Sequence, residues 1–194
     1  MDRRKDTVVE AVLEQLIEQG PGDIAGVFAR AFELAMRIER ETAKRVVSQD
    51  AVVVPTNITY ELLGTRGADF GLPPESVARV ADVRDAGLDT LGMLHEEGVL
   101  MGYGSDLLGG MQDYQSGEFP LRGRSLPAHD VIRSATLDAA RVMRMEGEIG
   151  AIAPGAHADL VMMAGNPLDD LSLLDGQGEH LDAIMKDGHF IKRA

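Results

Sequence analysis

Cysteine and tryptophan are absent from this chain of 194 residues, and aromatic side chains make up only 4% of it. Without cysteine the protein has neither disulfides nor thiolate ligands, so a metal site must use His, Asp, Glu or a modified Lys. Only five histidines are present, which limits any site built from several imidazoles. No apolar run approaches the roughly 20 residues that a membrane-spanning helix needs.

Positive charge is also scarce, because the formal net charge is −13. This excess of negative charge argues against a nucleic acid or an anionic membrane as a partner. Hydrophobic residues make up 44% of the chain and charged residues 26%, which is typical of a globular domain with a core. The first residues lead into an amphipathic helix rather than an apolar signal core, so we expect a cytoplasmic location.

Two amphipathic helices are predicted before residue 49. The first covers residues 7–19, where apolar side chains recur at helical spacing, and Gly20-Pro21-Gly22 ends it. The second runs from Asp23, a good N-cap, to about Ser48. The apolar face of this helical hairpin packs against the chain's own core in the favoured interpretation, and binds a partner or a second copy in the alternative.

Two short apolar runs, at residues 51–54 and 99–105, are predicted as buried parallel strands. Pro55 and Thr56 follow the first run, and Asp106 ends the second. Between the runs, Pro73-Pro74-Glu75 begins a helix that extends to about residue 94. Strand, helix and strand together predict a βαβ unit with a right-handed crossover.

Asp106 is the principal candidate for chemistry. It lies at the carboxyl end of a predicted strand, where α/β folds place ligands and catalytic groups. A carboxylate there can bind a metal or accept a proton from water. The alternative is an aspartate that only caps the next turn, since Asp is a common turn residue.

Two long loops, at residues 56–72 and 107–127, are predicted beside these strands, and long loops in compact domains are often functional. Candidate substrate contacts are Thr56 and Tyr60 in the first loop, and Tyr114 and Gln115 in the second. Other large side chains of the second loop are Glu118, Phe119 and Arg122. This loop either lines a substrate pocket or is a surface loop that packs on itself.

The last third of the chain predicts a helix followed by a small β module. The helix runs from Pro127 to about Met145. A strand is expected at residues 158–163, and a hairpin at residues 181–192 turns at Asp187-Gly188.

Several of these segments, in this order, resemble the amidohydrolase superfamily. Gly104-Ser105-Asp106 is similar to the end of the last barrel strand, and residues 134–141 resemble the helix that follows it. The run at residues 148–161 resembles the signature that re-enters the small β-sandwich domain, and residues 165–170 and 184–188 continue it. Residues 114–119 and the strand at 54–56 are most similar to the imidazolonepropionase-like and Xaa-Pro dipeptidase branch.

The resemblance implies an α/β chain that is the C-terminal fragment of a metal-dependent hydrolase (β/α)8 TIM barrel, with part of the small β-sandwich domain. The expected divisions are a helical segment at residues 1–48, the last two strand–helix units of the barrel at 49–146, and the β-sandwich part at 147–194. The implied activity is hydrolysis of a carbon–nitrogen bond in a small amide or dipeptide. The resemblance further implies that a divalent metal, with Zn²⁺ as the expected ion, activates the attacking water. Asp106 is then expected to be both a metal ligand and the proton shuttle.

The chain also departs from the family pattern, because it contains no His-x-His pair. None of the five histidines lies at the carboxyl end of a predicted barrel strand, so they are interpreted as surface or structural residues; they are His95, His129, His157, His180 and His189. Two strands cannot close a barrel, so a second copy or a partner chain is expected to cover their edges. We therefore consider three alternatives: an active hydrolase, an inactive product of a truncated or frame-shifted gene that acts through association, and a subunit that completes a barrel with a ligand-bearing partner.

Overall fold

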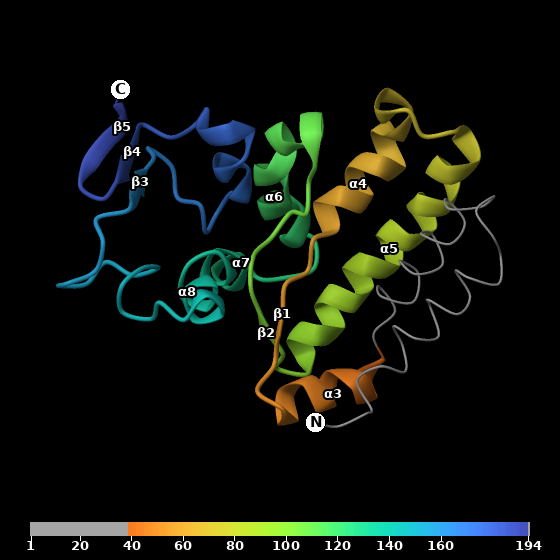
Figure 1. Ribbon diagram of the computed structural model, residues 1–194, viewed down its shortest axis with the longest axis horizontal. Coiled ribbons are helices and arrows are strands. Elements are labelled where there is room, and N and C mark those ends of the chain that lie inside the picture. The colour runs from red at the N-terminus through yellow and green to blue at the C-terminus, as the bar shows by residue number, and fades with distance from the viewer. Residues whose placement is uncertain (1–38, 194) are drawn as a thin grey trace.

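The computed structural model describes residues 39–193. The helix predicted at residues 7–19 and the first part of that predicted at 23–48 lie outside the described residues. The remainder of the second helix is present as α3 (Arg40–Ser48). Figure 1 shows a short pair of strands at the centre, long helices on one flank, and a small β module at the opposite end near the C-terminus.

The predicted βαβ unit is confirmed. Strand β1 (Val52–Val53) pairs in parallel with β2 (Leu100–Met101), and the connection between them ends with the predicted helix, α5 (Pro74–Glu96). Regular pairing ends sooner than the predicted strand at 99–105. The amide of Gly102 still donates to the Val53 carbonyl at 2.9 Å, but Pro55 then removes a donor from β1, so the ladder ends.

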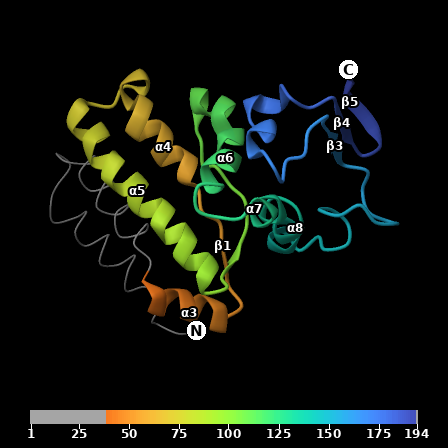
Figure 2. The same ribbon diagram turned by 180° about the vertical axis from the view of Figure 1, so that it is seen from behind.

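The predicted loop at residues 56–72 is wrong, because the structure has helix α4 (Asn57–Arg66) and the 3₁₀ turn η1 (Gly67–Phe70) there. Figure 2 shows α4 and α5 side by side from the rear. An added Cβ at Gly64 would lie 3.5 Å from the backbone of Ala81 in α5, so the two helices approach closely. The buried side chains of Ile58 and Leu62 stabilise α4 through tertiary packing, which overrides its weak local propensity.

Helix α5 confirms the prediction made from its start signals, with Pro74 at its first turn and Glu75 close behind. Its carboxyl-terminal half supplies Leu91 and Leu94, which are 1% and 2% exposed. These side chains pack against β2 and against α7 (Ala128–Ser134) in the main core cluster. The buried members of that cluster are Ala43, Leu91, Leu94, Val99, Met101, Leu126 and Val131.

The second predicted loop and the helix after it also differ from expectation. Residues 107–127 contain a long 3₁₀ segment, η2 (Gly109–Gly117), and a short helix, α6 (Glu118–Arg122). The single helix predicted at 127–145 is two helices, α7 and α8 (Leu137–Met143), with a break at Thr136. The Thr136 hydroxyl donates to the Ile132 carbonyl at 2.9 Å, a side-chain bond that competes with the helical pattern.

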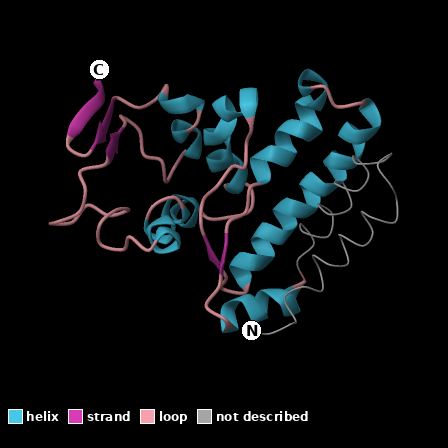
Figure 3. Cartoon of the chain, viewed as in Figure 1, coloured by secondary structure: helices cyan, strands magenta, loops and turns pink. Residues whose placement is uncertain are grey.

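The small β module is confirmed as an antiparallel sheet in the order β3 (Leu160–Met162), β4 (Ala183–Lys186) and β5 (His189–Arg193). Figure 3 shows these strands apart from the central pair. Asp187 and Gly188 form the hairpin tip with φ values of 48° and 78°, as a two-residue turn with left-handed backbone requires. Two 3₁₀ turns, η3 (Leu171–Leu174) and η4 (Gly176–Gly178), precede β4.

Within residues 39–193, no helix combines the length and apolar character that crossing a bilayer requires.

Gly150 joins the helical part to the β module at a position that excludes any side chain. Its φ is +79°, and an added Cβ would lie 2.5 Å from the carbonyl oxygen of Thr136. We expect Gly150→Ala to lower the free energy of unfolding by about 2–4 kcal/mol, because backbone strain and overpacking add together.

Urea unfolding measures this loss, and Gly155→Ala is the matched control. Gly155 has a φ of +91° with no neighbouring atom within 4 Å of the added Cβ, so only the strain remains, about 1–2 kcal/mol. Equal losses in the two variants would contradict the packing at Gly150.

Low pH is expected to destabilise the sheet of the β module by protonating Asp159. Its carboxylate accepts a hydrogen bond from the Lys186 ammonium and another, of 2.7 Å, from the Asp187 amide. The Lys186 bond first and the amide second hold the pKa of Asp159 below its usual value. A lowered folded-state pKa stabilises the sheet at a pH above the unfolded value near 4, and this stabilisation is lost as the pH falls through the folded value.

An NMR titration of the side-chain carboxyl carbon of Asp159, assigned by its loss in Asp159→Asn, measures this effect. The carbon should shift with a midpoint at a pH below 4 in the wild type. A wild-type midpoint above 4 would contradict the lowered pKa.

Candidate active-site edge

The ends of β1 and β2 lie together, and the segments that follow them carry three of the candidate residues, Thr56, Tyr60 and Asp106. An added Cβ at Gly104 would lie 2.7 Å from Val54 Cγ1 and 3.5 Å from Thr56 Cγ2. The Thr59 hydroxyl donates to the Ser105 carbonyl at 2.7 Å and reaches the Asp106 carbonyl at 3.2 Å. The first turn of α4 is therefore joined to the segment that follows β2. We call this region the carboxyl edge: residues 54–60 and 102–106.

Asp106 lies at this edge, beyond the last paired residue of β2. Its side chain is exposed and its φ is +49°, a left-handed conformation that aspartate tolerates better than most residues. Tyr60, which is 7% exposed, lies close enough for the negative charge of Asp106 to act on its phenol. Burial first and the Asp106 charge second raise the pKa of Tyr60 to about 12, so its phenol stays protonated at neutral pH.

A buried ion pair lies directly beneath the carboxyl edge. Glu118 and Arg122, at the two ends of α6, are both 0% exposed, and Arg122 Nε donates to Glu118 Oε1 at 2.7 Å. The prediction that these residues line a pocket or belong to a surface loop is wrong. Glu and Arg four residues apart on a helix commonly pair, and the apolar residues between them were the available signal of burial.

Glu118 performs the capping role that Thr56 does not, since Thr56 precedes α4 without a side-chain capping bond. The Glu118 carboxylate accepts hydrogen bonds from the amides of Ile58 at 2.6 Å and Asn57 at 3.3 Å. Burial raises the pKa of Glu118, and the Arg122 guanidinium and the two amides oppose that rise.

Asn57 is a polar residue at this edge that the sequence interpretation missed. It is 3% exposed, and within the described residues its side-chain oxygen and nitrogen have no hydrogen-bond partner. Such a buried amide costs about 1–3 kcal/mol unless water or a ligand satisfies it. Its place directly after Thr56 was the only signal in the sequence.

The two candidates of the second loop occupy different surroundings. Tyr114 packs against the core cluster that contains Leu107, next to Asp106, and the Arg66 guanidinium lies 4.9 Å from its ring centre. Gln115 lines a cavity of about 330 Å³ with Tyr103, Phe119 and side chains of the β module. The structure thus gathers Thr56, Tyr60 and Asp106, while Gln115 faces the β module.

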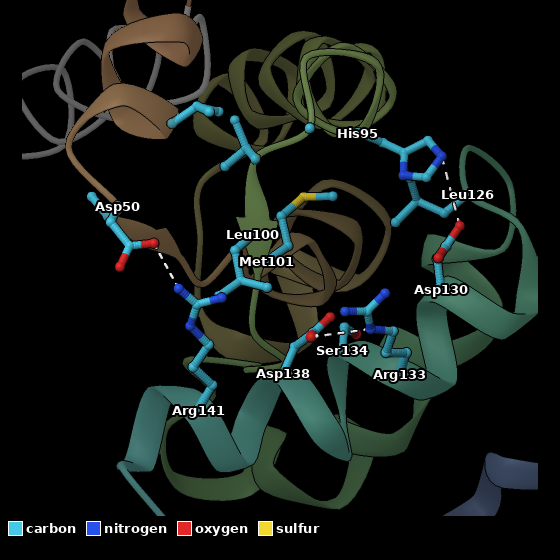
Figure 4. A pocket seen from close by; sticks show the side chains of 14 residues that line it. Asp50, His95, Leu100, Met101, Leu126, Asp130, Arg133, Ser134, Asp138 and Arg141 are labelled. Carbon is cyan, nitrogen blue, oxygen red and sulfur yellow. Dashed lines mark hydrogen bonds and ion pairs between the residues drawn. The ribbon is translucent and has the colours of Figure 1, made fainter. Parts of the chain in front are cut away.

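A second cavity, of about 350 Å³, lies at the opposite end of β2, beside Gly98, Val99 and Leu100. Figure 4 shows three contacts between polar side chains around this cavity. Asp50 pairs with Arg141 at 2.6 Å, Arg133 with Asp138 at 3.2 Å, and His95 approaches Asp130 at 3.6 Å. The two arginines are already paired with aspartates, and the cavity lies toward the opposite end of β2 from the strand ends where α/β folds place catalytic groups.

The described residues do not by themselves fit a divalent metal. Among residues 39–193, no group of three or more His, Asp or Glu side chains converges as a metal site would require. His95 and His129 both approach Asp130, and His157 approaches Asp187 at 3.3 Å. Within residues 39–193, Asp106 therefore belongs to no cluster of three or more such side chains.

The family comparison identifies the class of protein to which this α/β chain belongs. The model of the amidohydrolase family matches residues 16–191, so the chain belongs to that family. The predicted superfamily and its Xaa-Pro dipeptidase branch are confirmed. Members of this family are generally metal-dependent and have TIM-barrel folds, and the described chain is a partial α/β structure of that kind.

Solved structures support the same assignment. An amidohydrolase is 42% identical with a TM-score of 0.77, and the match covers 88% of this chain and 43% of that one. A prolidase, solved in complex with N-methylphosphonate-L-proline, is 41% identical with a TM-score of 0.76, covering 86% and 43%. A Xaa-Pro dipeptidase with bound methionine is 25% identical with a TM-score of 0.70, covering 87% and 43%.

A curated relative gives a shorter match. A 5-methylthioadenosine/S-adenosylhomocysteine deaminase of Symbiobacterium thermophilum is 50% identical over 36 residues, which are 19% of this chain and 8% of that protein. The chain thus spans less than half the length of the solved structures that it matches.

Proposed function

We propose that this chain is part of a hydrolase that cleaves the carbon–nitrogen bond of a small amide, with a Xaa-Pro dipeptide as the first substrate class. The observation that carries the proposal is the placement of Asp106 at the joined ends of two parallel strands. The similarity to a prolidase and a Xaa-Pro dipeptidase supports the substrate class.

Asp106 is the proposed proton acceptor in this reaction. It takes a proton from the attacking water and returns it to the nitrogen that leaves. The protonated phenol of Tyr60 lies nearby as a hydrogen-bond donor, and Thr56 and Tyr114 border the same edge as proposed substrate contacts. Gln115 is proposed to reach the substrate only from the β-module side.

A divalent metal such as Zn²⁺ would need ligands from beyond residues 39–193, because Asp106 is the only proposed ligand there. We therefore assign no chemical step to a metal.

We also propose that residues 49–146 correspond to the last two strand–helix units of a barrel, and that residues 147–194 are part of a β-sandwich domain. The parallel pair β1–β2 supports this division.

The test is release of proline from a panel of Xaa-Pro dipeptides by the purified chain supplied with Zn²⁺. Parallel reactions contain non-prolyl dipeptides or 5-methylthioadenosine, which represents the deaminase relative. We expect proline release with kcat/KM at least tenfold above the value for non-prolyl dipeptides. Deamination without proline release would replace the dipeptidase proposal with a deaminase.

A second candidate is an inactive chain that acts through association. Two observations favour it: residues 39–193 contain no converging metal ligands, and each strand of the β1–β2 pair has one partner within this part of the chain. Unpaired strand edges invite another polypeptide. No turnover of any substrate, together with a dimer in sedimentation analysis, would favour this candidate over the first.

A further inference from the structure

The Arg122 guanidinium joins the ends of both central strands. Its Nη2 donates to the Pro55 carbonyl at 2.6 Å, and its Nη1 donates to the Gly102 carbonyl at 3.0 Å. Pro55 follows β1 and Gly102 follows β2. Because guanidinium is planar and rigid, these bonds set the separation of the two strand ends. The Ser134 hydroxyl of α7 accepts a further bond from Nη1 at 3.1 Å.

Glu118 extends this network to Asp106 through α4. Its carboxylate is bonded to Arg122 on one side and to the amides of Asn57 and Ile58 on the other. The same turn of α4 carries Thr59, which donates to the carbonyls of Ser105 and Asp106. Two sets of hydrogen bonds, joined by the backbone of the first turn of α4, therefore connect Arg122 to the backbone of Asp106.

Stability alone does not account for an ion pair in this place. The desolvation of two charges roughly cancels their attraction, so a well-packed apolar pair is often as stable or more stable. An apolar pair, however, has no directional bonds to offer the two strand-end carbonyls and the two helix amides. The charged pair supplies all four of these bonds at the carboxyl edge.

We propose that Glu118 and Arg122 are positioning residues, which hold the two strand ends and α4 so that Asp106 faces the substrate. The inference rests on the proposed function, because it assigns the reaction to Asp106. Neither side chain touches the substrate in this scheme.

The test compares Glu118→Gln and Arg122→Lys with the wild-type chain by two-dimensional NMR. Arg133→Lys is the matched control, since Arg133 is exposed and pairs with Asp138.

Both test variants should shift the amides of Thr59, Ser105 and Asp106, which neither Glu118 nor Arg122 contacts. They should also speed hydrogen exchange at Ile58 by at least tenfold, while exchange at Leu91 changes by less than threefold. Changes confined to the direct partners of Glu118 and Arg122 would overturn the inference.

Kinetics gives an independent readout. For folded variants we expect kcat on a Xaa-Pro dipeptide to fall by about tenfold or more while KM stays within twofold. Folded variants with wild-type kcat would overturn the positioning role and leave the proposed function intact. A wild-type chain that turns over no amide would overturn the proposed function instead, and the NMR comparison would still decide whether the pair positions Asp106.

Discussion

Arg122→Met is expected to lower the free energy of unfolding by about 3–5 kcal/mol, because removing one partner of a buried ion pair leaves an uncompensated charge. Arg122 and Glu118 are both 0% exposed, so no solvent reaches the carboxylate that remains. The carbonyls of Pro55 and Gly102 also lose their donor. Urea denaturation followed by circular dichroism measures the loss.

Two further variants make this prediction specific. Arg133→Met removes an arginine that is 57% exposed, and we expect a loss of about 0–1 kcal/mol. The double variant Glu118→Leu/Arg122→Met removes both charges, so it should recover part of the loss seen with Arg122→Met alone. A loss below 1 kcal/mol for Arg122→Met would contradict the burial of the pair.

Asp106→Asn is expected to lower kcat on a Xaa-Pro dipeptide by about 10²–10⁴-fold, the range that general acid–base catalysis contributes. Asparagine keeps the shape of the side chain but accepts no proton at neutral pH. Asp106 is exposed, so the free energy of unfolding should change by less than about 0.5 kcal/mol. Initial rates of proline release and urea unfolding measure the two quantities.

Asp113→Asn is the control for charge removal, because Asp113 is also exposed and lies in η2. The control should keep kcat within twofold of wild type. Equal rates in the two variants would mean that Asp106 is a turn residue, which was the alternative left open by its sequence context.

The sequence predicted those elements that local signals determine. Pro74 and Glu75 marked the start of α5, and Asp187-Gly188 marked the hairpin tip, because both depend on backbone preferences within a few residues. The parallel pairing of β1 and β2 followed from two apolar runs joined by one helix.

Elements stabilised by distant residues could not be predicted in the same way. Helix α4 is capped by Glu118, which lies 60 residues from Ile58 in the chain, and no pattern within 57–66 encodes that bond. Its apolar face becomes evident only when α5 lies against it. Glu118 and Arg122 look like loop residues until the strand ends surround them, so the ion pair beneath the candidate site was missed.

Substrate mapping by NMR tests the central claim most directly: that the carboxyl edge, rather than the cavity at the other end of β2, binds the substrate. A Xaa-Pro dipeptide would be titrated into the Asp106→Asn chain, which should bind it without turnover. The account predicts that the amides of Asn57, Thr59, Ser105 and residue 106 shift together with a single dissociation constant. Shifts gathered instead at His95, Leu100 and Arg141, around the cavity in Figure 4, would contradict it.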